Sequence, residues 1–164
     1  YNPKIKLIFI FRHPVDRAFS HWHMQRRKSF QTKSFSWAIR AGRRRLFGKS
    51  YQAIRNHKFF SYVERSYYGK QLERVLRLFP REQLLFLRFE DFNANPTKTI
   101  QEISEFLGVP APRKKYKPFE EAVSGLSNQT ILSAKDAEYL HSLYDEDLKL
   151  FAKLSGLNVT SWFH

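Results

Sequence analysis

The 164-residue chain contains no cysteine. Disulfide bonds, thiolate metal sites and thiol nucleophiles are therefore excluded. Long apolar runs are also missing. The longest run, residues 7–11, has the length of a strand, whereas a membrane-spanning helix needs about 20 mostly apolar residues.

Acidic residues are scarce in the first part of the chain. Residues 1–60 hold 15 Lys and Arg but a single acid, Asp16, whereas residues 61–164 hold 14 of each sign. The net charge of +14 therefore comes from the first 60 residues. A one-sided basic surface attracts anions. The partner is then a nucleotide, an acidic glycan, a nucleic acid or an anionic membrane, and charge alone does not choose among them.

Apolar spacing and capping residues predict two strands and several helices. The strands are expected at residues 6–11 and 83–89. The first has no polar alternation and is expected to be buried on both faces. Asn95 is expected to begin one helix and Gly108 to end it, and Ser133 is expected to begin the last helix, which Gly156 follows. The expected helices cover residues 14 to about 25, 34–45, 66–78, 95–107 and 133 to about 154, and residues 48–60 are expected to form a loop with one helical turn.

Strands separated by helices are typical of an α/β fold with a parallel sheet. We expect one domain that covers residues 1–164. Two strands are too few for a doubly wound sheet, so we expect this fold to be incomplete within the chain.

The segment KLIFIFRHPVDRAFS, residues 6–20, carries the chemistry. An apolar strand ends at Arg12, and Pro14 is suited to the first position of a helix. A helix N-terminus at the end of a strand binds anions, Arg12 offers a fork of donors, and Ser20 offers a hydroxyl. This arrangement predicts a phosphate site. The alternative is that Arg12 pairs with a carboxylate and that Ser20 is an ordinary surface or packing serine.

The pattern Arg12-x-Pro-x-x-Arg-x-x-Ser20 resembles the 3′-phosphate-binding motif of sulfotransferases that use 3′-phosphoadenosine-5′-phosphosulfate (PAPS). His13 stands where that motif usually has Asn. Residues 65–72 (RSYYGKQL) resemble the family's Arg-Gly-x-Tyr-x-x-x-Leu segment, and residues 106–108 (FLG) resemble the end of its following helix. The resemblance covers nearly the whole chain.

The resemblance implies a sulfotransferase fold related to P-loop NTPases, a PAPS donor with PAP as product, and no metal. Arg12 and Ser20 would hold the 3′-phosphate, and Tyr68 would lie near the nucleotide. The basic loop with Arg113, Lys114 and Lys115 would close over the nucleotide.

The family's glycine-rich loop, which binds the 5′-phosphosulfate and supplies a catalytic lysine, has no counterpart here. Gly48-Lys49-Ser50 lacks the preceding strand and the upstream glycine. We therefore expect the catalytic Lys and the His or Glu base upstream of Tyr1, in a missing N-terminal segment or a second chain. The catalytic residues of this chain stay unknown, and transfer by the chain alone is doubtful.

The implied activity is transfer of a sulfuryl group to a hydroxyl or amine of a carbohydrate or small molecule. The alternative is a basic, non-enzymatic module that binds nucleotides or nucleic acid, although we expect no specific nucleic acid. The lack of cysteine favours a bacterial cytoplasmic protein over one of the Golgi lumen.

Other polar clusters have competing interpretations. The arginines of residues 40–45 form either a solvated helix face or a docking surface for an acidic acceptor. Glu90 and Asp91 are expected to form a structural cap after the second strand. His21 and His23, two residues apart, point to different helix faces, which disfavours a metal site.

Overall fold

The computed structural model describes residues 2–118 and 131–163. The strands are β1, Leu7–Phe11, and β2, Leu84–Arg88. The helices are α1 Pro14–Arg27, α2 Phe35–Ile39, α3 Tyr51–Phe60, α4 Tyr68–Leu78, α5 Phe89–Ala94, α6 Pro96–Leu107 and α7 Ala134–Ser155. Short 3-10 helices are η1 Ala41–Leu46, η2 Glu64–Ser66, η3 Arg81–Gln83 and η4 Thr160–Trp162.

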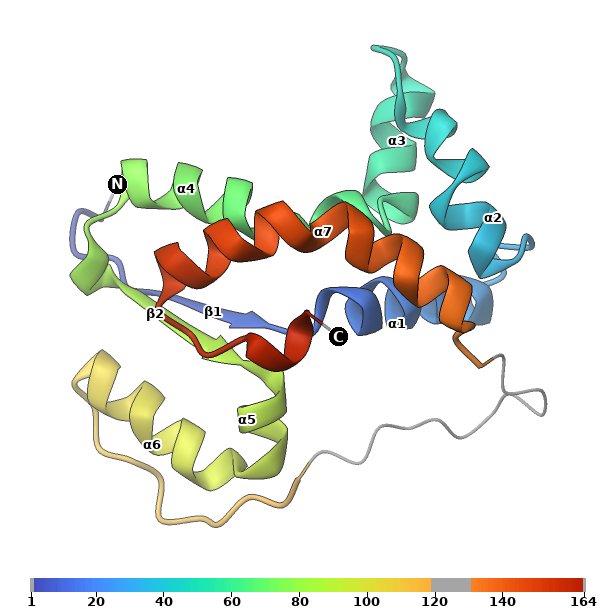
Figure 1. Ribbon diagram of the computed structural model, residues 1–164. Coiled ribbons are helices and arrows are strands. Elements are labelled where there is room, and N and C mark those ends of the chain that lie inside the picture. The colour runs from blue at the N-terminus through green and yellow to red at the C-terminus, as the bar shows by residue number, and fades with distance from the viewer. Residues whose placement is uncertain (1, 119–130, 164) are drawn as a thin grey trace.

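The two strands pair in parallel, as the sequence predicts, with Leu7 opposite Leu84 and Phe11 opposite Arg88. Helices α4 and α7 lie side by side along one side of the sheet, and α5 and α6 lie on the other side (Figure 1). Helix α1 continues from the end of β1, whereas α2 and α3 project from the body. No helix in residues 2–118 and 131–163 is long and apolar enough to cross a membrane.

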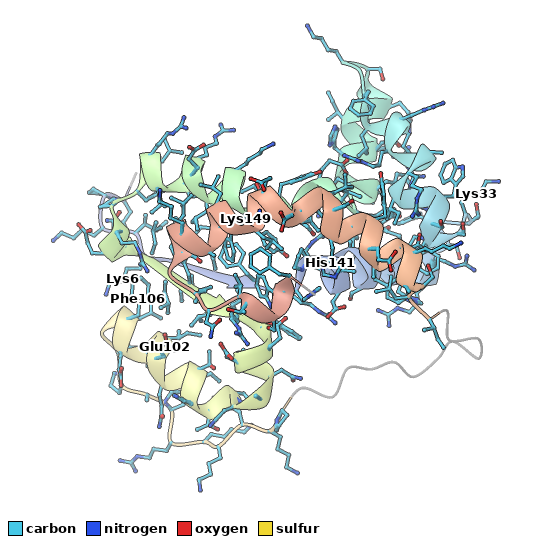
Figure 2. All side chains as sticks on the ribbon, in the orientation of Figure 1. Lys6, Lys33, Glu102, Phe106, His141 and Lys149 are labelled. Carbon is cyan, nitrogen blue, oxygen red and sulfur yellow. The ribbon has the colours of Figure 1, made fainter. Side chains whose placement is uncertain are left out.

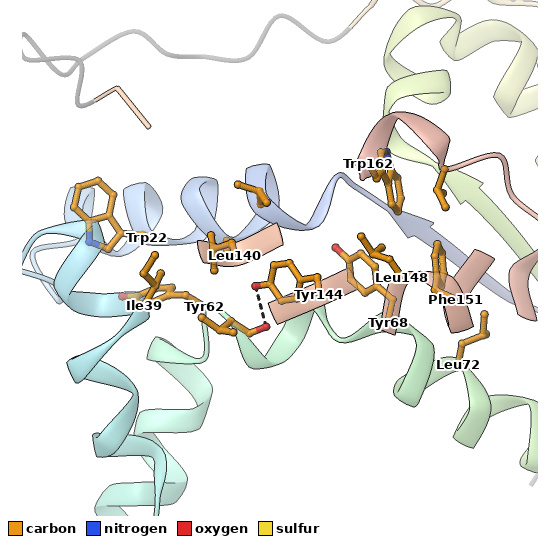
Figure 3. Packing of buried hydrophobic residues seen from close by; sticks show 14 of the residues in the cluster. Trp22, Ile39, Tyr62, Tyr68, Leu72, Leu140, Tyr144, Leu148, Phe151 and Trp162 are labelled. Atoms are coloured by element: carbon orange, nitrogen blue, oxygen red, sulfur yellow. Dashed lines mark hydrogen bonds between the residues drawn. The ribbon is translucent and has the colours of Figure 1, made fainter. Parts of the chain in front are cut away.

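Large aromatic side chains dominate the core. Trp22, Tyr62, Tyr144, Phe151 and Trp162 are at most 1% exposed. They extend from the α1–α2 end of the molecule to the sheet, with α7 running between (Figure 3). The α7 residues Leu140, Tyr144 and Leu148 supply the middle of this core, at the spacing of one helix face.

Capping residues set the helix ends as expected from the sequence. Asn95 accepts a hydrogen bond from Lys98 N (3.1 Å) at the start of α6, and Ser133 accepts one from Asp136 N (3.2 Å) at the start of α7. Gly108 and Gly156 end these helices in the left-handed conformation, at φ 76° and 71°. Glycine adopts that conformation without steric cost.

Three local predictions were wrong. Residues 51–60 form helix α3 in place of a loop, and Ser50 caps it by accepting a hydrogen bond from Ala53 N. The helix expected over residues 34–45 is broken at Arg40, where φ is −112° and ψ is −96°. Strand β1 is not buried on both faces, because Ile8 and Ile10 are 37% and 46% exposed.

Candidate functional site

At the junction between β1 and α1, a helix N-terminus without a side-chain cap follows the end of a parallel strand. Pro14 is the first residue of α1 and has no N–H, and His13 at the N-cap makes no side-chain capping hydrogen bond. The first N–H groups of a helix need an acceptor, and they carry the positive end of its dipole. The junction therefore suits an anion.

Arg12 is the last residue before this junction. Its side chain is half-buried, and its guanidinium lies 5.1 Å from the ring centre of Phe89, the first residue of α5. Its backbone carbonyl accepts a hydrogen bond from the Tyr68 hydroxyl at 3.0 Å. Arg12 is thus held through its backbone by α4 and through its side chain by α5.

His13 is fixed by three elements. Its backbone N–H donates to Glu90 Oε1 at 2.8 Å. Its ring packs edge-on against His141 of α7 and Trp162 of η4, at centroid distances of 5.5 and 6.2 Å. Figure 2 shows the position of His141 on α7. Burial lowers the pKa of His13, which keeps the ring neutral near pH 7.

Arg17 of the motif is a structural residue. Its Nε donates to Ser66 Oγ at 2.6 Å, and its guanidinium also donates to the Tyr62 carbonyl. Ser66 Oγ in turn donates to the Pro14 carbonyl at 3.0 Å. These bonds connect the first turn of α1 to η2 and so fix the position of the β1–α1 junction.

Ser20 is exposed on α1. It lies about 9 Å beyond Pro14 along the helix axis, from the 1.5 Å rise per residue. The spacing of four places Asp16, also exposed, on the same face. Arg12 thus lies two residues before the start of α1, and Ser20 lies in its second turn.

Tyr68 lies in the core. It is 5% exposed, its ring contacts Phe11, Phe151 and Trp162, and burial raises its pKa to about 12. The structure therefore gives Tyr68 a positioning contact to the Arg12 carbonyl. A direct contact with a nucleotide stays a prediction.

The basic loop is held by α6. Arg113, Lys114 and Lys115 are exposed, and the next residue, Tyr116, donates its N–H to Thr97 Oγ1 at 2.9 Å. Figure 1 shows this segment running along α6 on the side away from β2. Its closure over a nucleotide stays a prediction.

Most of the arginines at residues 40–45 serve the fold. Arg40 pairs with Asp136, and Arg43 pairs with Glu64 at 2.7 Å. The Arg45 guanidinium lies 3.7 Å from the ring centre of Phe60. Arg44 is exposed. The solvated or docking face expected from the sequence is therefore reduced to one of its four arginines.

Glu90 is a site residue whose partner the sequence left unnamed. Phe11 lies opposite Arg88 in the sheet, so two further residues bring His13 beside Glu90. The carboxylate then accepts the His13 N–H. Glu90 and Asp91 lie in the first turn of α5, whose start has no side-chain cap, so the structural cap expected after the second strand is not formed. The sequence signal for the contact between His13 and Glu90 was that the two residues follow the ends of the two predicted strands.

A model of the sulfotransferase domain matches residues 1–151. The membrane-associated sulfotransferase kil1 of Dictyostelium discoideum is 29% identical over 100 residues, which are 57% of this chain and 21% of that protein. The human bifunctional heparan sulfate N-deacetylase/N-sulfotransferase 2 is 27% identical over 110 residues, or 65% of this chain and 12% of that protein.

A sulfotransferase crystal structure from Alicyclobacillus acidocaldarius superposes with a TM-score of 0.77 at 25% identity. The match covers 97% of this chain and 57% of that one. The chain thus spans little more than half of that structure and about a fifth or less of the two curated relatives. With its two-stranded parallel sheet and the matching domain model, the chain belongs to the sulfotransferase family and has its α/β fold.

Proposed function

We propose that the chain binds PAPS as the sulfuryl donor of a sulfotransferase, and that Arg12 and Ser20 hold its 3′-phosphate. The observation that carries the proposal is the β1–α1 junction. There Arg12 follows a parallel strand, and the next helix begins with no side-chain cap. Ligands of open α/β sheets bind at this edge, outside the carboxyl ends of the strands.

The donor set fits a phosphate dianion. A guanidinium offers paired N–H donors, the start of α1 offers backbone N–H groups, and Ser20 offers a hydroxyl. PAPS supplies the sulfuryl group when bound. Arg12 and Ser20 bind and orient the nucleotide, and neither transfers a proton.

We propose a carbohydrate or small molecule with a hydroxyl or amine as acceptor. One relative is named for N-sulfation of heparan sulfate, which supports an amine on a glycan. The excess of Lys and Arg in residues 1–60 also favours an acidic acceptor.

Replacement of Arg12 by Ala tests the nucleotide site. Hydrogen bonds to charged groups contribute about 1.5–3 kcal/mol each, so Arg12→Ala should weaken binding of PAP by roughly 10- to 100-fold. Binding of adenosine 5′-phosphosulfate, which has no 3′-phosphate, should change by less than about threefold. Isothermal titration calorimetry with both nucleotides measures the two effects.

Arg44→Ala is the matched control, because Arg44 is exposed and lies in the same basic part of the chain. It should leave the affinity for both nucleotides unchanged. Equal losses for PAP and adenosine 5′-phosphosulfate in Arg12→Ala would refute the assignment. Salt-dependent binding to any DNA, with no preference for PAP, would favour a non-enzymatic nucleic-acid module.

A further inference from the structure

Three large apolar side chains are exposed at the outer end of the projection formed by α2, η1 and α3. Phe47 is 74% exposed, Tyr51 80% and Ile54 64%. Figure 1 shows that the connection from η1 to α3 lies at the far end of this projection. Single exposed apolar residues are common on protein surfaces, but neighbouring ones at a projecting end indicate a binding surface.

The spacing in α3 places Tyr51 and Ile54 on one outer face together with two cationic residues. Tyr51, Ile54, Arg55 and Lys58 are separated by three, four and seven positions and are all exposed. Ala53 and Asn56 are buried on the opposite side, where the Asn56 amide donates to the Arg45 carbonyl at 2.8 Å. Helix α3 is therefore amphipathic, with an outer face that combines apolar and cationic side chains.

The surroundings of this face carry charge of one sign. Residues 17–63 contain 12 Lys and Arg but no Asp or Glu. Arg44, Lys49, Arg55 and Lys58 are exposed near the apolar residues, whereas Arg40, Arg43 and Arg45 make contacts within the fold. We call the exposed set Phe47, Lys49, Tyr51, Ile54, Arg55 and Lys58 the α3 tip.

This combination fits the surface of an anionic bilayer. Apolar side chains of an interfacial helix enter the boundary between headgroups and acyl chains, and Lys and Arg extend towards the lipid phosphates. Each cation near an anionic membrane strengthens binding. An acidic glycan would use the same cations, but it offers no apolar phase for Phe47 and Ile54.

We propose that the α3 tip docks the protein on anionic membranes, with Phe47, Tyr51 and Ile54 inserted and Lys49, Arg55 and Lys58 at the headgroups. The surface is separate from the β1–α1 junction, so the proposal does not depend on nucleotide binding. Docking of this kind is peripheral and reversible.

Vesicle sedimentation tests the proposal. The chain should bind vesicles of phosphatidylcholine with phosphatidylserine, bind vesicles of phosphatidylcholine alone much more weakly, and dissociate as salt rises. The double variant Phe47→Ser/Ile54→Ser should bind the anionic vesicles at least about tenfold more weakly, because it loses the burial of two apolar side chains in the bilayer. Its circular dichroism spectrum should not change.

Leu78→Ser is the matched control, since Leu78 is 66% exposed at the end of α4, away from the α3 tip. It should bind like the unchanged chain. Undiminished vesicle binding by the double variant, or equal loss in Leu78→Ser, would overturn the proposal, as would failure of the unchanged chain to bind anionic vesicles.

Two further measurements separate the other occupants of this surface. The double variant should elute from a heparin column at the same salt concentration as the unchanged chain. If its retention on heparin falls as much as its binding to vesicles, the surface would be assigned to a glycan and the proposal would be overturned. Sedimentation velocity should show the same mass for both proteins. A dimer that dissociates in the double variant would assign the surface to a second copy, and would also overturn the proposal.

Discussion

The position of Arg12 is set by contacts with residues that are distant in the sequence. The Tyr68 hydroxyl bonds to its carbonyl, and Glu90 bonds to the next N–H. The sequence of residues 6–20 alone was enough to predict that Arg12, a helix start and Ser20 follow the end of a strand. Glu90 is 77 residues away from His13 in the chain, so that bond requires the strand register to be known.

Tyr68→Phe tests whether the hydrogen bond from the Tyr68 hydroxyl positions Arg12. The variant keeps the buried ring but removes the hydroxyl, which leaves the Arg12 carbonyl without this donor. We expect a loss of about 1 kcal/mol in the free energy of unfolding, measured by urea denaturation. We also expect PAP binding to weaken a few-fold. Tyr51→Phe, at an exposed position, should change neither quantity. Full stability and full affinity in Tyr68→Phe would contradict the positioning role.

His21 makes stability depend on pH. Burial lowers its pKa to about 4, and the positive charges of Arg17 and Arg65 act in the same direction. An unfolded histidine has a pKa near 6.5, so the unfolded state binds the proton more readily below that pH. The contribution of His21 is therefore complete above pH 6.5 and is lost as the pH falls towards 4. Burial of His13 adds in the same direction.

The urea concentration at the unfolding midpoint should therefore decrease as the pH is lowered from 6.5 to 4. This decrease should be smaller in His21→Gln. His57→Gln, at an exposed position of α3, is the control and should follow the unchanged chain. An identical pH profile in His21→Gln would show that this histidine does not carry the effect.

At the scale of elements, α4 and α7 meet at Gly69. A Cβ at this position would lie 2.4 Å from the Asp147 carbonyl and 3.1 Å from Phe151 N. Asp147 is buried, and its carboxylate accepts the N–H groups of Gly69 (2.8 Å) and Lys70 (3.0 Å). A side chain of α7 thus caps the first turn of α4, and the close approach of the two backbones requires glycine.

Gly69→Ala separates helix propensity from packing. In an exposed helix this change stabilises by about 1 kcal/mol. Here the clash is with backbone atoms, so we expect net destabilisation of about 1–3 kcal/mol. Thermal unfolding measures it, and Lys70→Ala, at the exposed next position, should be nearly neutral. A higher melting temperature for Gly69→Ala would show that the helices can move apart at little cost.

Helices with capping residues or a clear apolar stripe were predictable. Asn95, Gly108, Ser133 and Gly156 mark the ends of α6 and α7 in the sequence and in the structure. Helix α3 was missed because its exposed face carries Tyr51 and Ile54, which hides the usual polar and apolar alternation. The break at Arg40 depends on tertiary contacts of that arginine with Tyr139 and Asp136.

At the scale of the whole molecule, the sequence predicted the α/β class, the parallel pairing and the asymmetric charge. It also predicted a β1 strand buried on both faces, as runs of apolar residues in parallel sheets usually are. In the structure Leu7, Phe9 and Phe11 pack against the core cluster, while Ile8 and Ile10 are exposed. An apolar run indicates that a strand can be covered on both faces, whereas actual burial depends on which elements pack against it.

We expect the 3′-phosphate of the donor to bind at the β1–α1 junction, and a crystal structure of the chain with PAP would show its position. The 3′-phosphate should lie at the start of α1, within hydrogen-bond distance of the Arg12 guanidinium and Ser20 Oγ. A 3′-phosphate bound elsewhere, with Arg12 and Ser20 not in contact with the nucleotide, would contradict this expectation.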